Sequence, residues 1–256
     1  MPYDHPVRLR SPPRITRKQK WLAAHPIRPV ADILVLAGDI IPFIAMDQCN
    51  DFFTYLSDHF QATYWLPGNH EYYASDILQR SGSFREAIRP NVFLLNNQVE
   101  QLADTTLIFS TLWSHISPAA EWNIARAVTD YRIITRNGQP FRPLHSNRLH
   151  RECRTFIESA VAAATTPHII VATHHVPTFQ HYPSQFRGSI INEAFATEMV
   201  EFIEPSPVTA WIYGHHHTNT PEFIIGSTRL LTNQLGYVRK REYYGFSSEA
   251  ILNHSR

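Results

Sequence analysis

The stretch Ile33-Leu34-Val35-Leu36-Ala37-Gly38-Asp39 sets the pattern on which the fold depends. Five apolar residues in succession are too few for a helix of ordinary length. They predict a buried strand, and Gly38-Asp39 begins the loop after it. Three other short apolar runs end in the same way, at Gly68-Asn69-His70-Glu71, at His174-His175 and at Gly214-His215-His216-His217. Side chains that can bind a metal therefore follow four predicted strands.

Strands alternate with helices along most of the chain. Strands are predicted at 64–66, 92–95, 106–109, 168–173 and 210–213, and helices at 44–60, 75–89, 147–164 and 190–204. Asn96-Asn97 is expected to begin a loop, and residues 115–146 carry few strand signals. Segments 223–231 and 246–252 are expected to finish the chain as antiparallel strands. The alternation predicts an α/β fold with helices outside the sheet.

Length and composition exclude several classes of protein. A chain of 256 residues suits one domain of ordinary size or two small ones. Lys plus Arg number 23 against 22 Asp plus Glu, so the chain is not built as a general polyanion binder. No apolar run approaches the roughly 18 residues of a membrane helix, and the basic N-terminus lacks the apolar stretch of a signal peptide. Two cysteines, Cys49 and Cys153, fit a reducing cytoplasm, the expected location.

Residues 1–17 differ from the rest of the chain. They are rich in arginine and proline and have no periodic apolar pattern, which predicts an irregular basic arm before a single domain over 18–256. A solvated tail and an anion-binding arm both fit this composition. Tyr3 is the one aromatic residue before Trp21, so a stacking pattern is missing and we expect no nucleic-acid partner.

The side chains that follow the four strands can converge on one site. In α/β sheets, sites form outside the carboxyl ends of the strands. Glycines before Asp39, Asn69 and His215 fit tight turns that direct the next side chain into a cleft. Residues two apart in an extended segment project to the same side. We therefore expect His215 and His217 to face one metal or two adjacent ones, while His216 points away.

The same reasoning makes His174 and His175 point in opposite directions, so that one of the pair is a ligand. Taken singly, each motif has an ordinary explanation, since Asp and Asn form turns and histidine pairs lie on surfaces. The joint order of the motifs is the signal, in a chain with 15 histidines. Oxygen and imidazole ligands without cysteine suit Mn, Fe, Zn, Co or Ni.

The order Gly-Asp, Gly-Asn-His-Glu, His, Gly-His-x-His resembles that of the calcineurin-like metallophosphoesterase superfamily over about residues 31–252. Segments 31–40, 111–114, 173–177 and 211–215 look closest to a bacterial phosphohydrolase-like subgroup. The resemblance implies a four-layer α/β/β/α sandwich of two mixed sheets. It also implies metal-dependent hydrolysis of phosphoester bonds by a metal-activated hydroxide.

The resemblance assigns roles to single residues. The metal ligands would be Asp39, Asn69, His174, His215 and His217. Asp39 would bridge two divalent metals, and His217 would belong to the first of them. His70 would lie beside the leaving-group oxygen, oriented by Glu71. Two metals can acidify a bridging water and clamp phosphate oxygens, and an imidazolium can donate a proton to the departing oxygen.

One motif of the superfamily is missing. An Asp-x-His sequence should follow the first strand and supply the other ligands of the first metal. Asp4-His5 lacks the spacer and follows no apolar strand, and Asp32 lies roughly 23 Å from Asp39 along one strand. The fold is therefore expected to lack its normal first strand, leaving a neighbouring strand with unpaired backbone groups. Either half of the site is lost, or residues 1–17 are not the natural N-terminus. The abrupt change near Lys18 favours an altered reading frame or a misassigned start.

Two functions remain open. One is hydrolysis of a small-molecule phosphoester, impaired by loss of half the dinuclear site. The alternative is an inactive protein of the same fold that binds one metal and a phosphorylated ligand. Monoesters, diesters and nucleotides are all substrates in the superfamily. His175 and Arg187 are candidate substrate contacts, as are arginines of the segments 113–146 and 176–192, although a solvated surface explains the arginines equally well.

Overall fold

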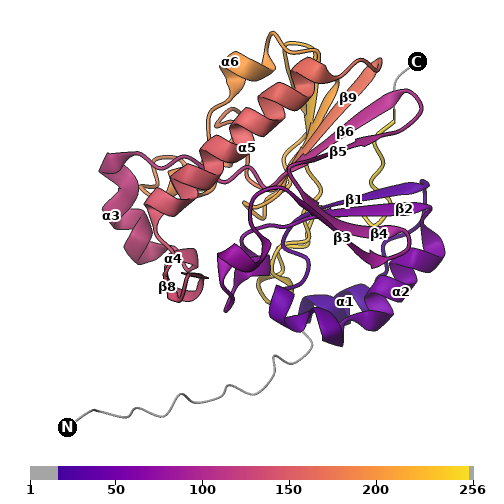
Figure 1. Cartoon of the computed structure of the whole chain (residues 1–256), viewed down its shortest axis with the longest axis horizontal. Helices are drawn as coiled ribbons and strands as arrows, with labels where there is room; N and C mark the ends of the chain where they lie inside the picture. The colour runs from indigo at the N-terminus through magenta and orange to yellow at the C-terminus, as the bar shows by residue number, and fades with distance from the viewer. Residues whose placement is uncertain (1–16, 254–256) are drawn as a thin grey trace.

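Two β-sheets lie face to face between helices in the computed structural model, which describes residues 17–253 (Figure 1). The first sheet has the order β1-β2-β4-β3, and its strands are β1 (Ile33–Ala37), β2 (Ala62–Leu66), β3 (Phe84–Arg89) and β4 (Val92–Asn96). The strands β1, β2 and β4 are parallel, whereas β3 is antiparallel to β4. The first sheet is therefore mixed.

The second sheet has six strands in the order β11-β12-β10-β9-β6-β5. They are β5 (Gln98–Gln101), β6 (Thr105–Ser110), β9 (His168–Thr173), β10 (Ala210–Ile212), β11 (Phe223–Ile225) and β12 (Thr228–Leu231). The four central strands are parallel, and β5 and β11 pair antiparallel at the two edges. The second sheet is therefore mixed as well.

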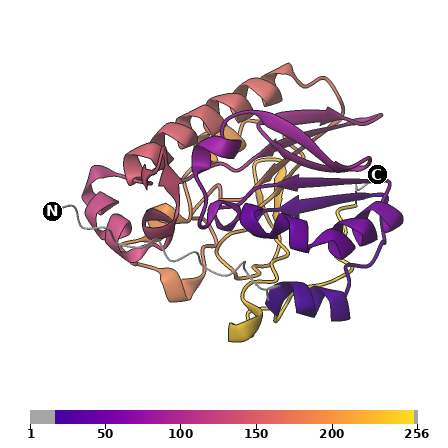
Figure 2. The same cartoon turned by 60° about the horizontal axis from the view of Figure 1, so that its bottom comes forward.

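Helices cover the outer face of each sheet (Figures 1 and 2). The α-helices are α1 (Arg17–Ala24), α2 (Asn50–His59), α3 (Pro118–Ala127), α4 (Asp130–Ile133), α5 (Pro143–Ala163) and α6 (Val200–Ile203). Short 3₁₀ helices are η1 (Phe43–Gln48), η2 (His70–Tyr72), η3 (Ile77–Arg80), η4 (Ser184–Phe186), η5 (Asn192–Ala194) and η6 (Val238–Lys240), and β7 (Thr135–Arg136) pairs with β8 (Gln139–Pro140). The result confirms the predicted four-layer α/β/β/α sandwich.

The apolar periodicity of each element explains this layering. Phe53 and Leu56 lie on one side of α2 and pack on the first sheet with Trp65. Cys153, Ile157 and Val161 recur every four residues on α5 and pack on the outer face of the second sheet. A third cluster, which contains Tyr64, Leu66, Phe109 and Ile170, fills the space between the sheets.

Several elements differ from the sequence prediction. The predicted helix 75–89 is wrong. η3 ends at Arg80, Gly82 turns the chain with a φ of 73°, and alternating burial makes 84–89 the strand β3. The predicted helix 190–204 is also wrong, because only the short helices η5 and α6 form there. The predicted helix 44–60 divides at Cys49 into η1 and α2.

Two further differences concern loops and strands. The predicted loop at Asn96-Asn97 is a single turn, with Asn97 at a φ of 49°, and β5 follows at once. The segment 246–252, predicted as a strand, is not one.

Two other predictions concern the ends of the chain. The strand pair β11–β12 is antiparallel as expected. The predicted arm lies outside the described residues except for Arg17, which begins α1.

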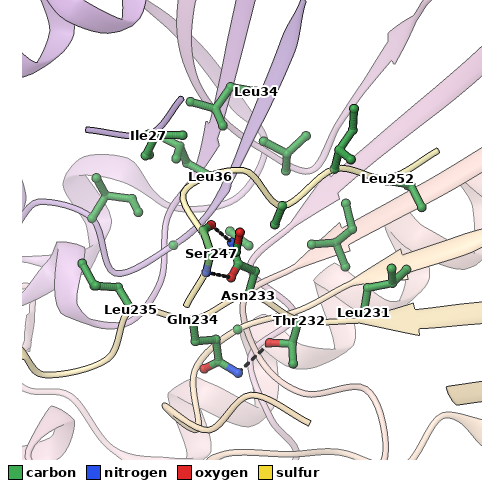
Figure 3. A pocket seen from close by; sticks show the side chains of 18 of the residues that line it. Ile27, Leu34, Leu36, Leu231, Thr232, Asn233, Gln234, Leu235, Ser247 and Leu252 are labelled. Carbon is green, nitrogen blue, oxygen red and sulfur yellow. Dashed lines mark hydrogen bonds between the residues drawn. The ribbon is translucent and has the colours of Figure 1, made fainter. Parts of the chain in front are cut away.

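Strand β1 lies at an edge of the first sheet among the described residues. The absence of the normal first strand stays a prediction, because residues 1–16 lie outside the described part of the chain. Within residues 17–253, β1 pairs only with β2. A cavity of about 490 Å³ lies beside it, lined by Leu34 and Leu36 of β1 and by Leu231 and Leu252 on the other side (Figure 3). Two hydrogen bonds between Asn233 and Ser247 hold the C-terminal segment along this cavity (Figure 3).

The helices of the described residues are all too short or too polar to cross a membrane.

Candidate metal centre

The predicted site residues follow the carboxyl ends of four strands from both sheets. Asp39 follows β1, Asn69 follows β2, His174 follows β9 and His215 follows β10. Strand β1 pairs parallel with β2, and β9 pairs parallel with β10. His174 contacts Ala37 and Asn69 across the two sheets, so all four strands end at the same side of the sandwich. Atoms that can bind a metal on Asp39, His174 and His215 lie within 4.8 Å of one another, and all three residues are buried.

Unusual backbone conformations place these side chains. Asp39, His215 and His217 have φ values of 60°, 77° and 54°, in the left-handed region that non-glycine residues rarely adopt. Such strain concentrates at functional sites. The sequence argument assumed that the segment 215–217 is extended, and these φ values show that it is not. His216 still points away, toward Gln234, whose Nε2 lies 3.0 Å from its Nδ1.

Two of the glycines are required by close packing around His174. A Cβ on Gly38, whose φ is 85°, would overlap the His174 ring and the backbone of Gly68. A Cβ on Gly68 would overlap both Asp39 and His174. The φ of Gly68 is not positive, so the requirement for glycine at this position comes from the close approach of these side chains.

Hydrogen bonds to carbonyl groups fix the tautomers of two histidines. His174 Nδ1 lies 2.8 Å from the Ala37 carbonyl, and His215 Nε2 lies 3.3 Å from the Ala194 carbonyl. A carbonyl only accepts, so these nitrogens carry the protons. In the neutral rings His174 Nε2 and His215 Nδ1 then carry lone pairs, and they face each other at 2.9 Å.

Two oxygens complete a cluster of acceptors around the His174 Nε2 atom. Asn69 Oδ1 lies 3.1 Å from it and Asp39 Oδ1 lies 3.4 Å from it. Burial, with the nearby His175 and His174, lowers the pKa of His215 well below its ordinary value, so that ring is neutral. Four electron-rich atoms facing one another repel, and a divalent cation relieves that repulsion. The donor set of two imidazoles, a carboxylate and an amide oxygen fits such a cation.

The second oxygen of Asp39 faces another pair of histidines. Its Oδ2 lies 3.2 Å from His70 Nδ1 and 3.8 Å from His217 Nε2. Burial tends to raise the pKa of Asp39, but attraction to His70 and His174 holds it well below its ordinary value. Asp39 thus faces different groups with its two oxygens, as a bridging carboxylate requires.

Glu71 does not contact His70 in the predicted manner. It is completely buried, and its two oxygens accept hydrogen bonds from backbone N–H groups of Asp39, Ile40, Ile41 and Gly68. Burial and the neighbouring Asp39 raise the pKa of Glu71 to about 7, against the effect of these bonds. Glu71 therefore holds the two ligand-bearing loops together, and the orientation of His70 comes from other residues.

His70 and His217 are the partly exposed members of the site. His70 Nε2 lies 3.1 Å from the Tyr237 hydroxyl, and the Tyr237 ring stacks on the His70 ring. Burial and the nearby Asp39 raise the pKa of Tyr237 to about 12, so its hydroxyl stays protonated. His217 Nδ1 lies 2.9 Å from Glu242 Oε2. These groups form the solvent-facing side of the centre.

One of the two candidate substrate contacts lies away from the cluster's open side. His175 is 1% exposed, lies against the rings of Trp113 and His215, and bonds through Nδ1 to the Thr111 carbonyl. It is thus beneath the cluster rather than on an open face. Arg187 is an exposed residue at the end of η4.

Sequence reasoning missed four residues at the centre, namely Tyr73, Asp130, Tyr237 and Glu242. Asn69 Nδ2 donates a 2.8 Å hydrogen bond to Asp130 Oδ1, which also accepts one at 2.9 Å from the Tyr73 hydroxyl. These residues lie in no recognisable motif. Only the chain path through α4 and the loop around η6 brings Asp130 and Glu242 to the site.

A four-layer sandwich with oxygen and imidazole donors at its strand ends is suited to a metal-dependent enzyme. The model of the calcineurin-like phosphoesterase family matches residues 11–219, and the chain belongs to that family. It is a metal-dependent phosphoesterase, with the metal identity left open by the donor set.

The chain is also similar to two other proteins. An uncharacterized protein of Acanthamoeba polyphaga mimivirus is 32% identical over 230 residues, which cover 82% of this chain and 80% of the relative. The solved structure of a phosphopantetheinyl hydrolase from Mycobacterium tuberculosis has a TM-score of 0.59 and 16% identity, with 83% of each chain covered. The second likeness confirms the fold.

Proposed function

We propose that the chain hydrolyses a small phosphoester with one tightly bound divalent cation held by Asp39, Asn69, His174 and His215. The observation that carries this proposal is the convergence of three acceptor atoms on a fourth, His174 Nε2, at distances of 2.9 to 3.4 Å. When bound, a divalent cation in such a site acidifies water and polarises phosphate oxygens. Mn, Fe, Zn, Co and Ni all suit these ligands.

Residues on the partly exposed side of the centre would protonate the leaving group. His70 would hold a proton at Nε2 and transfer it to the departing oxygen of the ester. Its Nδ1 lies 3.2 Å from the Asp39 carboxylate, which would keep the ring oriented and favour its charged form. The Tyr237 hydroxyl, 3.1 Å from His70 Nε2, would fix the plane of the ring until substrate binds. The burial of the other ligands would keep bulk water from them.

We further propose that a second cation binds weakly beside His217. Asp39 Oδ2 and His217 Nε2 lie 3.8 Å apart, and the described residues form one group of three clustered metal-binding side chains, which does not include His217. A second position with fewer ligands would be occupied only at high metal concentration. Turnover would then be slow, because one metal acidifies and aims the attacking water less well than two.

The same shortage of ligands favours a second candidate function. The protein would bind one metal and a phosphorylated ligand without turnover. The two functions share the tight site and differ only in whether hydrolysis follows.

Two measurements test the two candidate functions. The first is calorimetric titration of metal-free protein with Mn²⁺ or Zn²⁺. The second is an assay with Mn²⁺ on generic phosphomonoesters and phosphodiesters. We expect close to one tight equivalent and slow hydrolysis. His215→Ala should lose the tight equivalent, and Glu222→Ala, which breaks a remote pair with Arg229, should keep it. Two tight equivalents would contradict the weak second position. One tight equivalent without any hydrolysis would favour the binding function.

A further inference from the structure

Asp130 is a buried carboxylate in contact with a proposed metal ligand. It begins α4, lies 61 residues after Asn69 in sequence and is 3% exposed. Its Oδ1 accepts hydrogen bonds from Asn69 Nδ2 at 2.8 Å and from the Tyr73 hydroxyl at 2.9 Å. A buried carboxylate requires such partners, since an uncompensated buried charge is costly.

The Asn69 amide can be placed in two ways that have nearly the same shape. One directs its oxygen toward His174 Nε2, and the other directs its NH₂ group there. An amide oxygen can bind a cation, whereas an NH₂ group cannot. The choice between the two decides whether Asn69 is a ligand.

The groups on the far side of the amide make this choice. Asp130 Oδ1 can only accept a hydrogen bond while it is ionised. The Tyr73 oxygen lies 3.3 Å from Asn69 Nδ2 and is the second acceptor on the same side. Turning the amide over would place its oxygen against these two acceptors and its NH₂ group against the His174 lone pair. The contact of the amide oxygen with the Asp130 carboxylate would be repulsive, and the NH₂ group, donating to the neutral His174 ring, would occupy the place of a cation.

We infer that Asp130 is a positioning residue that holds the Asn69 amide with its oxygen toward the metal-ligand cluster. The inference rests on the proposed function only in requiring that a cation binds there. Partners of this kind orient metal ligands in many proteins, and their loss commonly lowers metal affinity about 10–100-fold.

The test is an isosteric series at Asp130, read by Co²⁺ and Mn²⁺ titration of metal-free protein and by the visible absorption of the Co²⁺ form. Asp130→Leu removes both acceptor oxygens and should weaken the tight equivalent about 10–100-fold. Asp130→Asn keeps one neutral acceptor and should weaken it about 3–10-fold, because neutral hydrogen bonds are roughly half as strong. The Co²⁺ spectrum of Asp130→Leu should resemble that of Asn69→Ala, since both lack the amide ligand.

A double-mutant cycle separates positioning from general destabilisation. If Asp130 acts through Asn69, either substitution at Asp130 should change metal affinity little in the Asn69→Ala background. Asp76→Asn is the matched control, because Asp76 accepts from the backbone N–H groups of Leu78 and Gly138 near α4 and contacts no ligand. It should lower thermal stability and leave metal affinity unchanged.

The outcomes are distinguishable. Unchanged metal affinity in Asp130→Leu, or an affinity loss of equal size in the Asn69→Ala background, would overturn the inference while leaving the proposed function in place. If Asp130→Leu does not fold, Asp130→Asn in the same cycle decides in the same way. Failure of the wild-type protein to bind a divalent cation would overturn the proposed function and the inference together.

Discussion

His217 donates a hydrogen bond through Nδ1 to Glu242 Oε2 at 2.9 Å. A carboxylate accepts and does not donate while ionised, so the Nδ1 atom carries the proton and Nε2 carries a lone pair directed toward the Asp39 side of the centre. Carboxylate–histidine pairs of this kind orient imidazole ligands and raise their basicity. Glu242 is therefore part of the proposed weak metal position.

Removal of this carboxylate should affect the weak metal position alone. We expect Glu242→Ala to lower the affinity for the second equivalent of Mn²⁺ about 10–100-fold and to leave the first equivalent unchanged. Calorimetric titration at high metal concentration measures both. Equal weakening of the two equivalents would show that Glu242 supports the whole site instead. Glu222→Ala serves as a control for the loss of a surface carboxylate.

His70→Asn should separate catalysis from metal binding. If His70 acts on the leaving group rather than as a ligand, metal affinity stays nearly intact while phosphoesterase activity falls about 10²–10⁴-fold, the usual contribution of general acid catalysis. Tyr237→Phe, which removes only the hydroxyl that contacts His70, should cause a smaller loss. A His70→Asn protein that no longer binds its metal would contradict this assignment.

The edge of the first sheet should accept a new strand. We expect that replacing residues 1–17 with an apolar strand ending in Asp-x-His raises activity, adds a second tight metal equivalent and raises the melting temperature together. The apolar cavity beside β1 and the ligand-poor side of Asp39 are adjacent, because both Leu34 and His217 line that cavity. Full activity of the unmodified chain would argue against this prediction.

The matched control for the new strand is the same apolar sequence ending in Asn-x-Ala. It should raise the melting temperature without adding a metal equivalent, because it fills the cavity and pairs with β1 but supplies no ligand. If both strands raise activity equally, sheet repair rather than ligand supply explains the gain.

His150 should make the fold sensitive to acid. Burial lowers the pKa of His150 to about 4, and its Nδ1 bonds the Trp113 carbonyl. Between pH 6.5 and 4 the unfolded chain binds a proton at this position and the folded chain does not, so stability falls as the pH falls. For a pKa shift of this size, the free energy of unfolding at pH 4 is lower by about 2–3 kcal/mol than at neutral pH. Full stability is present above pH 6.5.

His150→Asn tests this pH dependence, because the Asn amide can replace Nδ1 as a donor and does not titrate. Urea unfolding at pH 7 and pH 5 should show a smaller loss of stability for the variant than for the wild type. The same loss in both proteins would assign the acid sensitivity to other groups, such as His216, whose pKa burial also lowers to about 4.

The strand prediction succeeded where a short run of contiguous apolar residues marks the strand. β1, β9 and β10 were predicted within one residue of their ends, since a buried parallel strand needs apolar side chains on both faces. The helix prediction at 75–89 failed because Gly82 turns the chain and residues 84–89 alternate between more and less buried positions, which is the period of a strand. The long helix α5 was recognised from Cys153, Ile157 and Val161, although Pro143 starts it four residues earlier than predicted.

The candidate ligands were predictable because their chemistry is local. A residue type and its distance from the end of a strand are both readable in one segment of sequence, as for Asn69 and His174. The partners that orient these ligands were not readable. Asp130 and Glu242 lie 61 and 25 residues from the side chains that they contact, and no local pattern connects them.

The sequence by itself determined the order of the strands along the chain, the residues that end them and the family to which the chain belongs. The tertiary structure decided which oxygen of Asp39 faces which histidines, that Glu71 binds backbone N–H groups of two loops, and that the edge of β1 faces an apolar cavity. The physical reason is that hydrophobic periodicity is a property of short segments. Hydrogen-bond partners, tautomers and left-handed turns such as those at Asp39 and His215 are set by groups that meet only when both sheets have packed.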